Sequence, residues 1–193
     1  MAAPTLPVTG DEAADRLLVT DPLALLLGML LDQQVPMEWA FRAPATLKER
    51  LGDRFTAPAM AAMDPEDLVA VFCAKPALHR YPAAMGRRAH GVAAHLVEHY
   101  DGDAGALWRG AASGAELLDR IRALPGFGAE KAQIFLALLA KRMGVQAAGW
   151  EQAAGPFADG QPRSVADISS RDAFTQVRAW KQEQKRLGKK KSE

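Results

Sequence analysis

Leu124-Pro125-Gly126-Phe127-Gly128-Ala129-Glu130-Lys131-Ala132 is the stretch that decides the fold, because it places a proline and two glycines between two amphipathic segments. Apolar residues recur at helical spacing over 117–124, after Ser113 as a suitable N-cap. The same spacing returns over 134–139. The sequence therefore predicts two helices joined by a tight hairpin.

The hairpin has the composition of an anion-binding turn. Pro125 cannot continue a helix, because its ring clashes with the preceding turn and it lacks an N–H group. Gly126 and Gly128 are expected to adopt positive φ and to leave their amides uncovered. Amides at the positive end of a helix dipole bind phosphate oxygens. An ordinary packing turn between two helices is the alternative interpretation.

A second informative stretch is Asp21-Pro22-Leu23-Ala24-Leu25-Leu26-Leu27-Gly28-Met29-Leu30-Leu31-Asp32-Gln33-Gln34. Asp21 and Pro22 predict a capped helix start, and the apolar residues that follow predict a helix surrounded by others. Gln33 and Gln34 end the apolar run. Amide side chains at this place can hydrogen-bond base edges or fill the space left by an extruded base, or alternatively cap helix carbonyls.

These two stretches, about 90 residues apart, resemble the base-excision DNA glycosylases of the helix-hairpin-helix type, the HhH-GPD superfamily. The resemblance covers about residues 21–168 and implies an all-α fold of two helical lobes with the DNA cleft between them. Its expected organisation is one domain over 1–193, with a core barrel over 21–145 that includes the hairpin 124–132, and a second lobe from 1–20 and 146–193 that ends in the basic tail 185–193.

The resemblance also implies how DNA is held. In the family the hairpin amides grip the DNA backbone, often with a bound monovalent cation, and a glutamine that ends the first barrel helix probes the duplex. The expected partner is double-stranded DNA with a damaged or mismatched base, bound by a monomer that requires no other cofactor. The positions of this chain that match are Gly126, Phe127, Gly128, Glu130, Lys131, Gln33 and Gln34.

Base excision needs a carboxylate beside the sugar, because C1′ gains positive charge as the base leaves. In the family an aspartate lies about eighteen to twenty residues beyond the hairpin position at which lyase members carry a lysine. Glu130 stands at that position, so we expect hydrolysis of the N-glycosidic bond without lyase activity. Counting onward reaches residues 148–150, none of which is a carboxylate. Glu151 is the first candidate and Asp167 the alternative, with Asp159 and Asp32 as weaker choices.

Trp150 either lines the pocket for the flipped base or packs in the core. No carboxylate of this chain falls within the spacing that the family uses. A DNA-binding module without enzymatic activity is therefore the alternative function, and a helical bundle that binds proteins or is purely structural is a further one.

Composition limits the classes of protein to which this chain can belong. The 193 residues are 49% hydrophobic, enough for a full core, and hold no apolar run of membrane-spanning length. Residues 1–20 lack the basic start and apolar run of a signal peptide, so we expect a cytoplasmic protein. Cys73 is the only cysteine, which excludes an iron–sulfur cluster held by four cysteines, and we expect its side chain to be buried.

Charge is concentrated at the C-terminus. The formal net charge is +1, yet the last nine residues hold five basic side chains and one acidic one, which leaves −3 for residues 1–184. DNA affinity must then come from a local face and from the tail.

His95 and His99 are spaced to share one helix face and are expected to be ordinary surface residues rather than metal ligands. Trp39 and Val97 are expected in the core, and the basic, aromatic loop 75–81 either contacts nucleic acid or is simply exposed.

Overall fold

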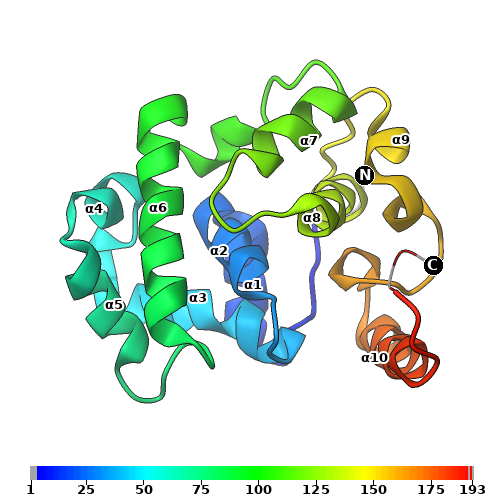
Figure 1. The fold of residues 1–193 in the computed structure, drawn as a ribbon, viewed down its shortest axis with the longest axis horizontal. Helices are drawn as coiled ribbons and strands as arrows, with labels where there is room; N and C mark the ends of the chain where they lie inside the picture. The colour runs from blue at the N-terminus through cyan, green and yellow to red at the C-terminus, as the bar shows by residue number, and fades with distance from the viewer. Residues whose placement is uncertain (1–3, 191, 193) are drawn as a thin grey trace.

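Asp21 begins the helix around which the molecule is built. In the computed structural model, which describes residues 4–190 and 192, the Asp21 carboxylate accepts hydrogen bonds from the amides of Leu23 and Ala24. The helix that follows, α2 (Pro22–Leu31), is buried at every residue from 23 to 31. Figure 1 shows α2 in the middle of the molecule, with α4 to α6 on one side and α8 to α10 on the other. The prediction of a surrounded central helix is confirmed.

The described residues form helices, turns and loops and contain no strand, so the all-α prediction is confirmed. None of these helices combines the length and the apolar character needed to cross a membrane. Besides α2, the elements are α1 (Glu12–Thr20), α3 (Met37–Leu51), η1 (Gly52–Arg54), α4 (Ala57–Ala62), α5 (Pro65–Cys73), α6 (Pro82–Tyr100), η2 (Ala104–Leu107), α7 (Gly114–Arg122), α8 (Ala129–Arg142), α9 (Trp150–Ala154), η3 (Gly155–Ala158), η4 (Val165–Asp167) and α10 (Arg171–Arg186).

Close helix packing around α2 depends on small residues. A Cβ atom added at Gly28 would lie 2.7 Å from Cδ1 of Phe41, so α2 and α3 approach as closely as a glycine allows. Gly86 of α6 similarly approaches the backbone of Val69 in α5, to 3.0 Å. These contacts hold α3 against the central helix and α6 against α5 at the close packing typical of protein interiors.

The predicted pair of helices is present as α7 and α8. Ser113 caps α7 by accepting a hydrogen bond from the Glu116 amide. The hairpin is anchored by Phe127, which is buried and lies 5.9 Å from the ring of Phe135 in α8. Pro125 packs toward Gly91 of α6. The hairpin is thus attached both to its own helices and to α6.

Three core predictions are wrong. Trp39 is 40% exposed because the buried stripe of α3 runs through Phe41 and Leu47, and Trp39 lies off that stripe. Val97 is also 40% exposed, because the inward face of α6 ends at Leu96. Cys73 is exposed at the last residue of α5, where no helix covers it. Phe41, on the buried stripe of α3, is fully buried.

The C-terminal helix α10 packs next to the start of the chain. Arg171 donates a hydrogen bond to the carbonyl of Pro7 at 3.4 Å, and Arg178 forms an ion pair with Glu38 of α3 at 2.9 Å. Ser170 caps the helix, and Phe174 and Val177 are its buried residues. Of the basic tail, Lys191 and the terminal Glu193 lie outside the described residues.

Candidate functional site

The hairpin and the end of α2 line a single open pocket of about 480 Å³. The two stretches that the sequence analysis singled out are therefore neighbours in space, although about 90 residues separate them. The lining residues are Met29, Asp32, Gln33, Gln34, Gly126, Gly128, Ala129, Glu130, Lys131 and Ile134.

Lys131 joins the two sides of this pocket. Its Nζ atom donates to the carbonyl of Leu30 at 2.7 Å and to Oε1 of Gln33 at 3.4 Å. The same ammonium lies 5.8 Å from the centroid of the Phe127 ring, within cation–π range. Lys131 therefore ties the first turn of α8 to the carbonyl end of α2.

The two hairpin glycines have different backbone conformations. Gly126 has φ +85°, in the left-handed region that favours glycine, and a Cβ there would lie 2.8 Å from Cδ1 of Leu30. Gly128 has φ −74° and ψ 174°, so the prediction of positive φ is wrong for it. Gly128 serves as the N-cap residue of α8, and N-cap residues adopt extended backbone. A Cβ at Gly128 would meet nothing within 4 Å, so this position faces open space.

The hairpin leaves several backbone N–H groups without an acceptor among the described residues. Within the part of the chain that the structure describes, no acceptor is found for the amides of Gly126, Gly128 and Ala129. The Phe127 amide instead donates to the Leu124 carbonyl, and the Phe127 side chain is buried. The hairpin thus offers N–H groups at the positive end of the α8 dipole, an arrangement that suits an anion.

The glutamine loop, residues 32–34 after α2, is held in place by His79. His79 is buried, and its Nδ1 accepts a hydrogen bond from the Tyr81 amide at 3.0 Å, so the proton is assigned to Nε2. Nε2 then donates to the Gln33 carbonyl, also at 3.0 Å. Gln33 is therefore fixed through its backbone by His79 and through its side chain by Lys131. This role of His79 is not visible in the sequence, because 46 residues separate the two partners.

Gln34 is exposed and has φ +56°, an unusual conformation for a residue other than glycine. Such strain costs about 1 kcal/mol or more and is often found at functional sites. The structure thus presents the Gln34 side chain at the edge of the pocket on a loop whose neighbour, Gln33, is immobilised.

The buried position of His79 predicts a pH dependence of stability. Burial lowers the pKa of His79 below its ordinary value of 6.5, against the opposing effect of its backbone hydrogen bonds. The unfolded chain therefore binds this proton more readily than the folded protein, and the free energy of unfolding should fall as the pH falls below about 6.5. Urea unfolding at about pH 7.5 and about pH 5.5 measures the effect.

The matching control is His79→Gln, which removes the titrating group. Burial also lowers the pKa of His95, so the variant should keep a smaller pH dependence rather than none. An equally large loss of stability in acid for wild type and variant would contradict the role given to His79.

Two exposed aromatic rings flank His79. Trp39 and Tyr81 are 40% and 44% exposed, and their ring centroids lie 6.4 Å and 6.1 Å from that of His79. The guanidinium of Arg80 lies over the Tyr81 ring at 5.4 Å. Arg50 holds this loop by donating to the Pro76 carbonyl at 2.7 Å. The loop 75–81 therefore presents an aromatic and basic surface next to the glutamines.

A second pocket, of about 340 Å³, lies on the other side of the glutamine loop. It is shared with α3 and α10 and includes basic side chains of α10. Its lining residues are Asp32, Gln33, Gln34, Val35, Pro36, Met37, Glu38, Arg178, Lys181 and Gln182. The segment 32–34 thus separates the hairpin pocket from a pocket against the C-terminal helix.

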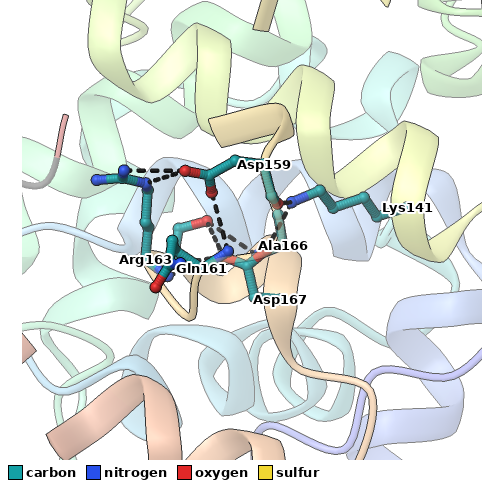
Figure 2. A network of polar contacts seen from close by, with 7 residues as sticks. Lys141, Asp159, Gln161, Arg163, Ala166 and Asp167 are labelled. Carbon is teal, nitrogen blue, oxygen red and sulfur yellow. Dashed lines mark hydrogen bonds and ion pairs between the residues drawn. The ribbon is translucent and has the colours of Figure 1, made fainter. Parts of the chain in front are cut away.

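Asp167 lies in a different polar network. Its carboxylate accepts from Nζ of Lys141 at 2.6 Å and from the amides of Arg163 and Ser164 at 3.0 and 2.9 Å. Figure 2 shows this network, in which Lys141 also donates to the Asp159 carbonyl. Lys141 stands ten residues beyond Lys131, or about 15 Å along α8. Asp167 therefore caps η4 near the far end of α8 from the hairpin.

Glu151 and Trp150 begin α9. Glu151 is exposed in the first turn of that helix, and Trp150 is partly buried against the core. The Trp150 backbone packs against Gly114, at the end of α7 remote from the hairpin. Neither residue is among those that line the hairpin pocket.

Asp32 is a carboxylate that does line both pockets. It is the C-cap residue of α2, and within the described residues no hydrogen bond or ion pair to its carboxylate is found. Asp32 is a weak candidate from sequence, because it precedes the hairpin by so many residues. The sequence feature that points to Asp32 is its place at the end of the buried helix, directly before the two glutamines.

The rings of His95 and His99 are tilted against each other with centroids 4.4 Å apart, in a separate pocket lined also by Tyr100 and Arg120. Among the residues that the structure describes, no group of three or more histidine, cysteine or acidic side chains is arranged to hold a metal ion. This pair is therefore set apart from the hairpin site.

Comparison of the sequence with models of known protein families finds no match, and comparison with curated proteins finds none either.

Proposed function

We propose that this chain is a DNA glycosylase of the helix-hairpin-helix type, which binds damaged duplex DNA, flips one base and hydrolyses its N-glycosidic bond without lyase activity. The observation that carries the proposal is the shared pocket: the hairpin and the glutamine loop, separated by about 90 residues, line the same 480 Å³ cavity. A hairpin that serves only for helix packing does not need a polar loop from another helix beside it.

The hairpin end of α8 is suited to a DNA phosphate. The amides of Gly126, Gly128 and Ala129 have no acceptor within the described residues, and Gly128 leaves the approach open. Lys131 is in the first turn of α8, and Arg88 of α6 comes within 3.4 Å of the Cβ position of Gly126. Backbone donors, the helix dipole and two nearby cations all favour an anion here.

The glutamine loop supplies the group for the space that a flipped base leaves. Gln34 is exposed on a strained backbone, while Gln33 is fixed by His79 and Lys131. A rigid loop that presents one amide side chain can enter a duplex without a large loss of its own conformational freedom. The exposed rings of Trp39 and Tyr81 provide stacking surfaces beside it.

In this proposal the DNA runs between two groups of helices. The core helices and the hairpin supply one side, and α10 with the N-terminal segment supplies the other, across the second pocket. Lys181 of α10 donates to the sulfur of Met37 at this boundary. The basic tail 185–193 adds affinity that does not depend on sequence and falls with salt.

Lyase activity is not part of the proposal. Glu130 stands where lyase members of the family carry a lysine, and a carboxylate forms no Schiff base. The neighbouring Lys131 is hydrogen-bonded to the Leu30 carbonyl. An ammonium held in this way donates its protons to a carbonyl rather than acting as an amine nucleophile.

A panel of duplexes with single damaged or mismatched bases tests the proposal. We expect the wild-type protein to leave an abasic site in at least one duplex, seen as strand cleavage after treatment with alkali. Without alkali the strand should stay intact. Cleavage without alkali would contradict the absence of lyase activity, and no base release from any duplex would contradict the enzymatic part of the proposal.

A DNA-binding module without enzymatic activity is the second candidate. It is favoured by the position of the two carboxylates predicted from sequence: Asp167 is occupied by Lys141, and Glu151 lies outside the hairpin pocket. This candidate predicts tight binding of duplex DNA without base release in the same panel.

A further inference from the structure

We propose that Asp32 is the catalytic carboxylate of the hairpin pocket, an inference that rests on the proposed glycosylase function. In this assignment Asp32 acts from the α2 side of the pocket, and the carboxylates that follow the hairpin in sequence take no part in the reaction. A base flipped beside Gln34 places its sugar between the hairpin and Asp32.

Asp32 is positioned by the end of a buried helix and by a hydrogen-bonded neighbour. Its amide donates to the carbonyls of Gly28 and Met29, which closes the last turn of α2. Every residue of α2 from 23 to 31 is buried, and the next residue, Gln33, is held by His79 and Lys131. A carboxylate on such a support keeps its place when substrate binds, as catalysis by electrostatic stabilisation requires.

The carboxylate is also available for a ligand. No hydrogen bond or ion pair to the Asp32 side chain is found within residues 4–190 and 192, whereas Asp167 is bonded to Lys141 and to two amides. Asp32 borders both the hairpin pocket and the pocket against α10, so it stands on the rim where the glutamine loop meets the open space.

Stability does not account for an acidic residue at this place. The C-terminus of a helix is the negative end of its dipole, where a carboxylate is disfavoured. Glu130, which lines the same pocket, is in the first turn of α8, where the dipole favours a negative charge. The two acidic residues of the pocket therefore differ, since only Glu130 has a structural reason for its charge.

The reaction assigned to Asp32 is a hydrolysis. The bond between C1′ and the base nitrogen breaks with its electron pair on the base, while the Asp32 carboxylate opposes the positive charge that develops at C1′. A water oxygen forms the new bond to C1′, and Asp32 accepts the proton that this water loses. The departing base takes up one proton from solvent and Asp32 returns one, so the products are the free base and a C1′ hydroxyl.

Single-turnover base release by the full chain tests the assignment, on a duplex found to be a substrate in the panel. Asp32→Asn keeps the size of the side chain and removes its charge, so we expect release to slow by about a hundredfold or more with unchanged affinity for the duplex. Thermal unfolding should show the variant to be at least as stable as wild type, because a disfavoured charge has been removed.

Glu151→Gln, outside the hairpin pocket, is the matched control and should release base at nearly the wild-type rate. Wild-type release by Asp32→Asn, with loss of release in Glu151→Gln, would overturn the assignment to Asp32 and leave the glycosylase proposal standing. Absence of release by the wild-type protein from every duplex would overturn both.

Discussion

Gly128→Ala is expected to fold as stably as the wild-type protein and to bind duplex DNA about tenfold to a hundredfold more weakly. Gly128 has φ −74°, and a Cβ there meets nothing within 4 Å, so alanine adds no strain to the folded protein. We expect the added methyl group to crowd a phosphate that approaches the hairpin amides. A phosphate would then lose charge-assisted hydrogen bonds worth about 1.5–3 kcal/mol.

Gly126→Ala is the matched control, because the same substitution acts there on the fold. At φ +85°, alanine is strained by about 1–2 kcal/mol, and its Cβ would lie 2.8 Å from Leu30. This variant should show a lower free energy of unfolding in urea.

Fluorescence anisotropy with a labelled duplex at one salt concentration measures the affinity of each variant. Wild-type affinity of a folded Gly128→Ala protein would contradict phosphate binding at the hairpin. A strong loss of stability in Gly128→Ala would instead contradict the difference between the two glycines.

Lys131→Met should lower the free energy of unfolding by about 1–3 kcal/mol. The substitution removes the donor that satisfies the Leu30 carbonyl at 2.7 Å and leaves that helix end without its partner. It also releases Oε1 of Gln33 and the contact with the Phe127 ring. Methionine keeps the length and apolar stem of the side chain, so the loss reports on the ammonium.

Urea unfolding of Lys131→Met and of Lys189→Met gives the comparison. Lys189 is an exposed lysine beyond α10, so its substitution removes the same charge without breaking a buried contact. Equal stability of the two variants would show that Lys131 does not join the hairpin to α2.

Local signals allowed much of the helical fold to be predicted from the sequence. Asp21 and Pro22 start α2 as expected, and Ser113 caps α7 as expected. These features depend on hydrogen bonds and apolar spacing within a few residues of the chain. Trp39 and Val97 were placed wrongly, because which face of a helix is covered depends on neighbours that are distant in sequence.

The candidate site was predictable only in part, for the same reason. The hairpin and the glutamines are each visible as short motifs, yet the contact between Lys131 and the Leu30 carbonyl joins residues 101 positions apart. Counting along the chain reaches Glu151 and Asp167, and neither is among the residues that line the hairpin pocket. A fixed spacing holds only where the loop beyond the hairpin helix follows one path, and here that segment forms α9 and the Asp167 network instead.

The central claim is that the hairpin and the glutamine loop form one DNA-binding site. An NMR titration of the ¹⁵N-labelled protein with a duplex that contains a stable abasic-site analogue tests it most directly. The account predicts that the backbone amide signals of Gly126, Gly128 and Ala129 and the side-chain amide of Gln34 shift together along one binding curve. Signals of α4, on the far side of α6, should stay in place. Shifts confined to the basic tail, or shifts of the hairpin without the Gln34 amide, would contradict it.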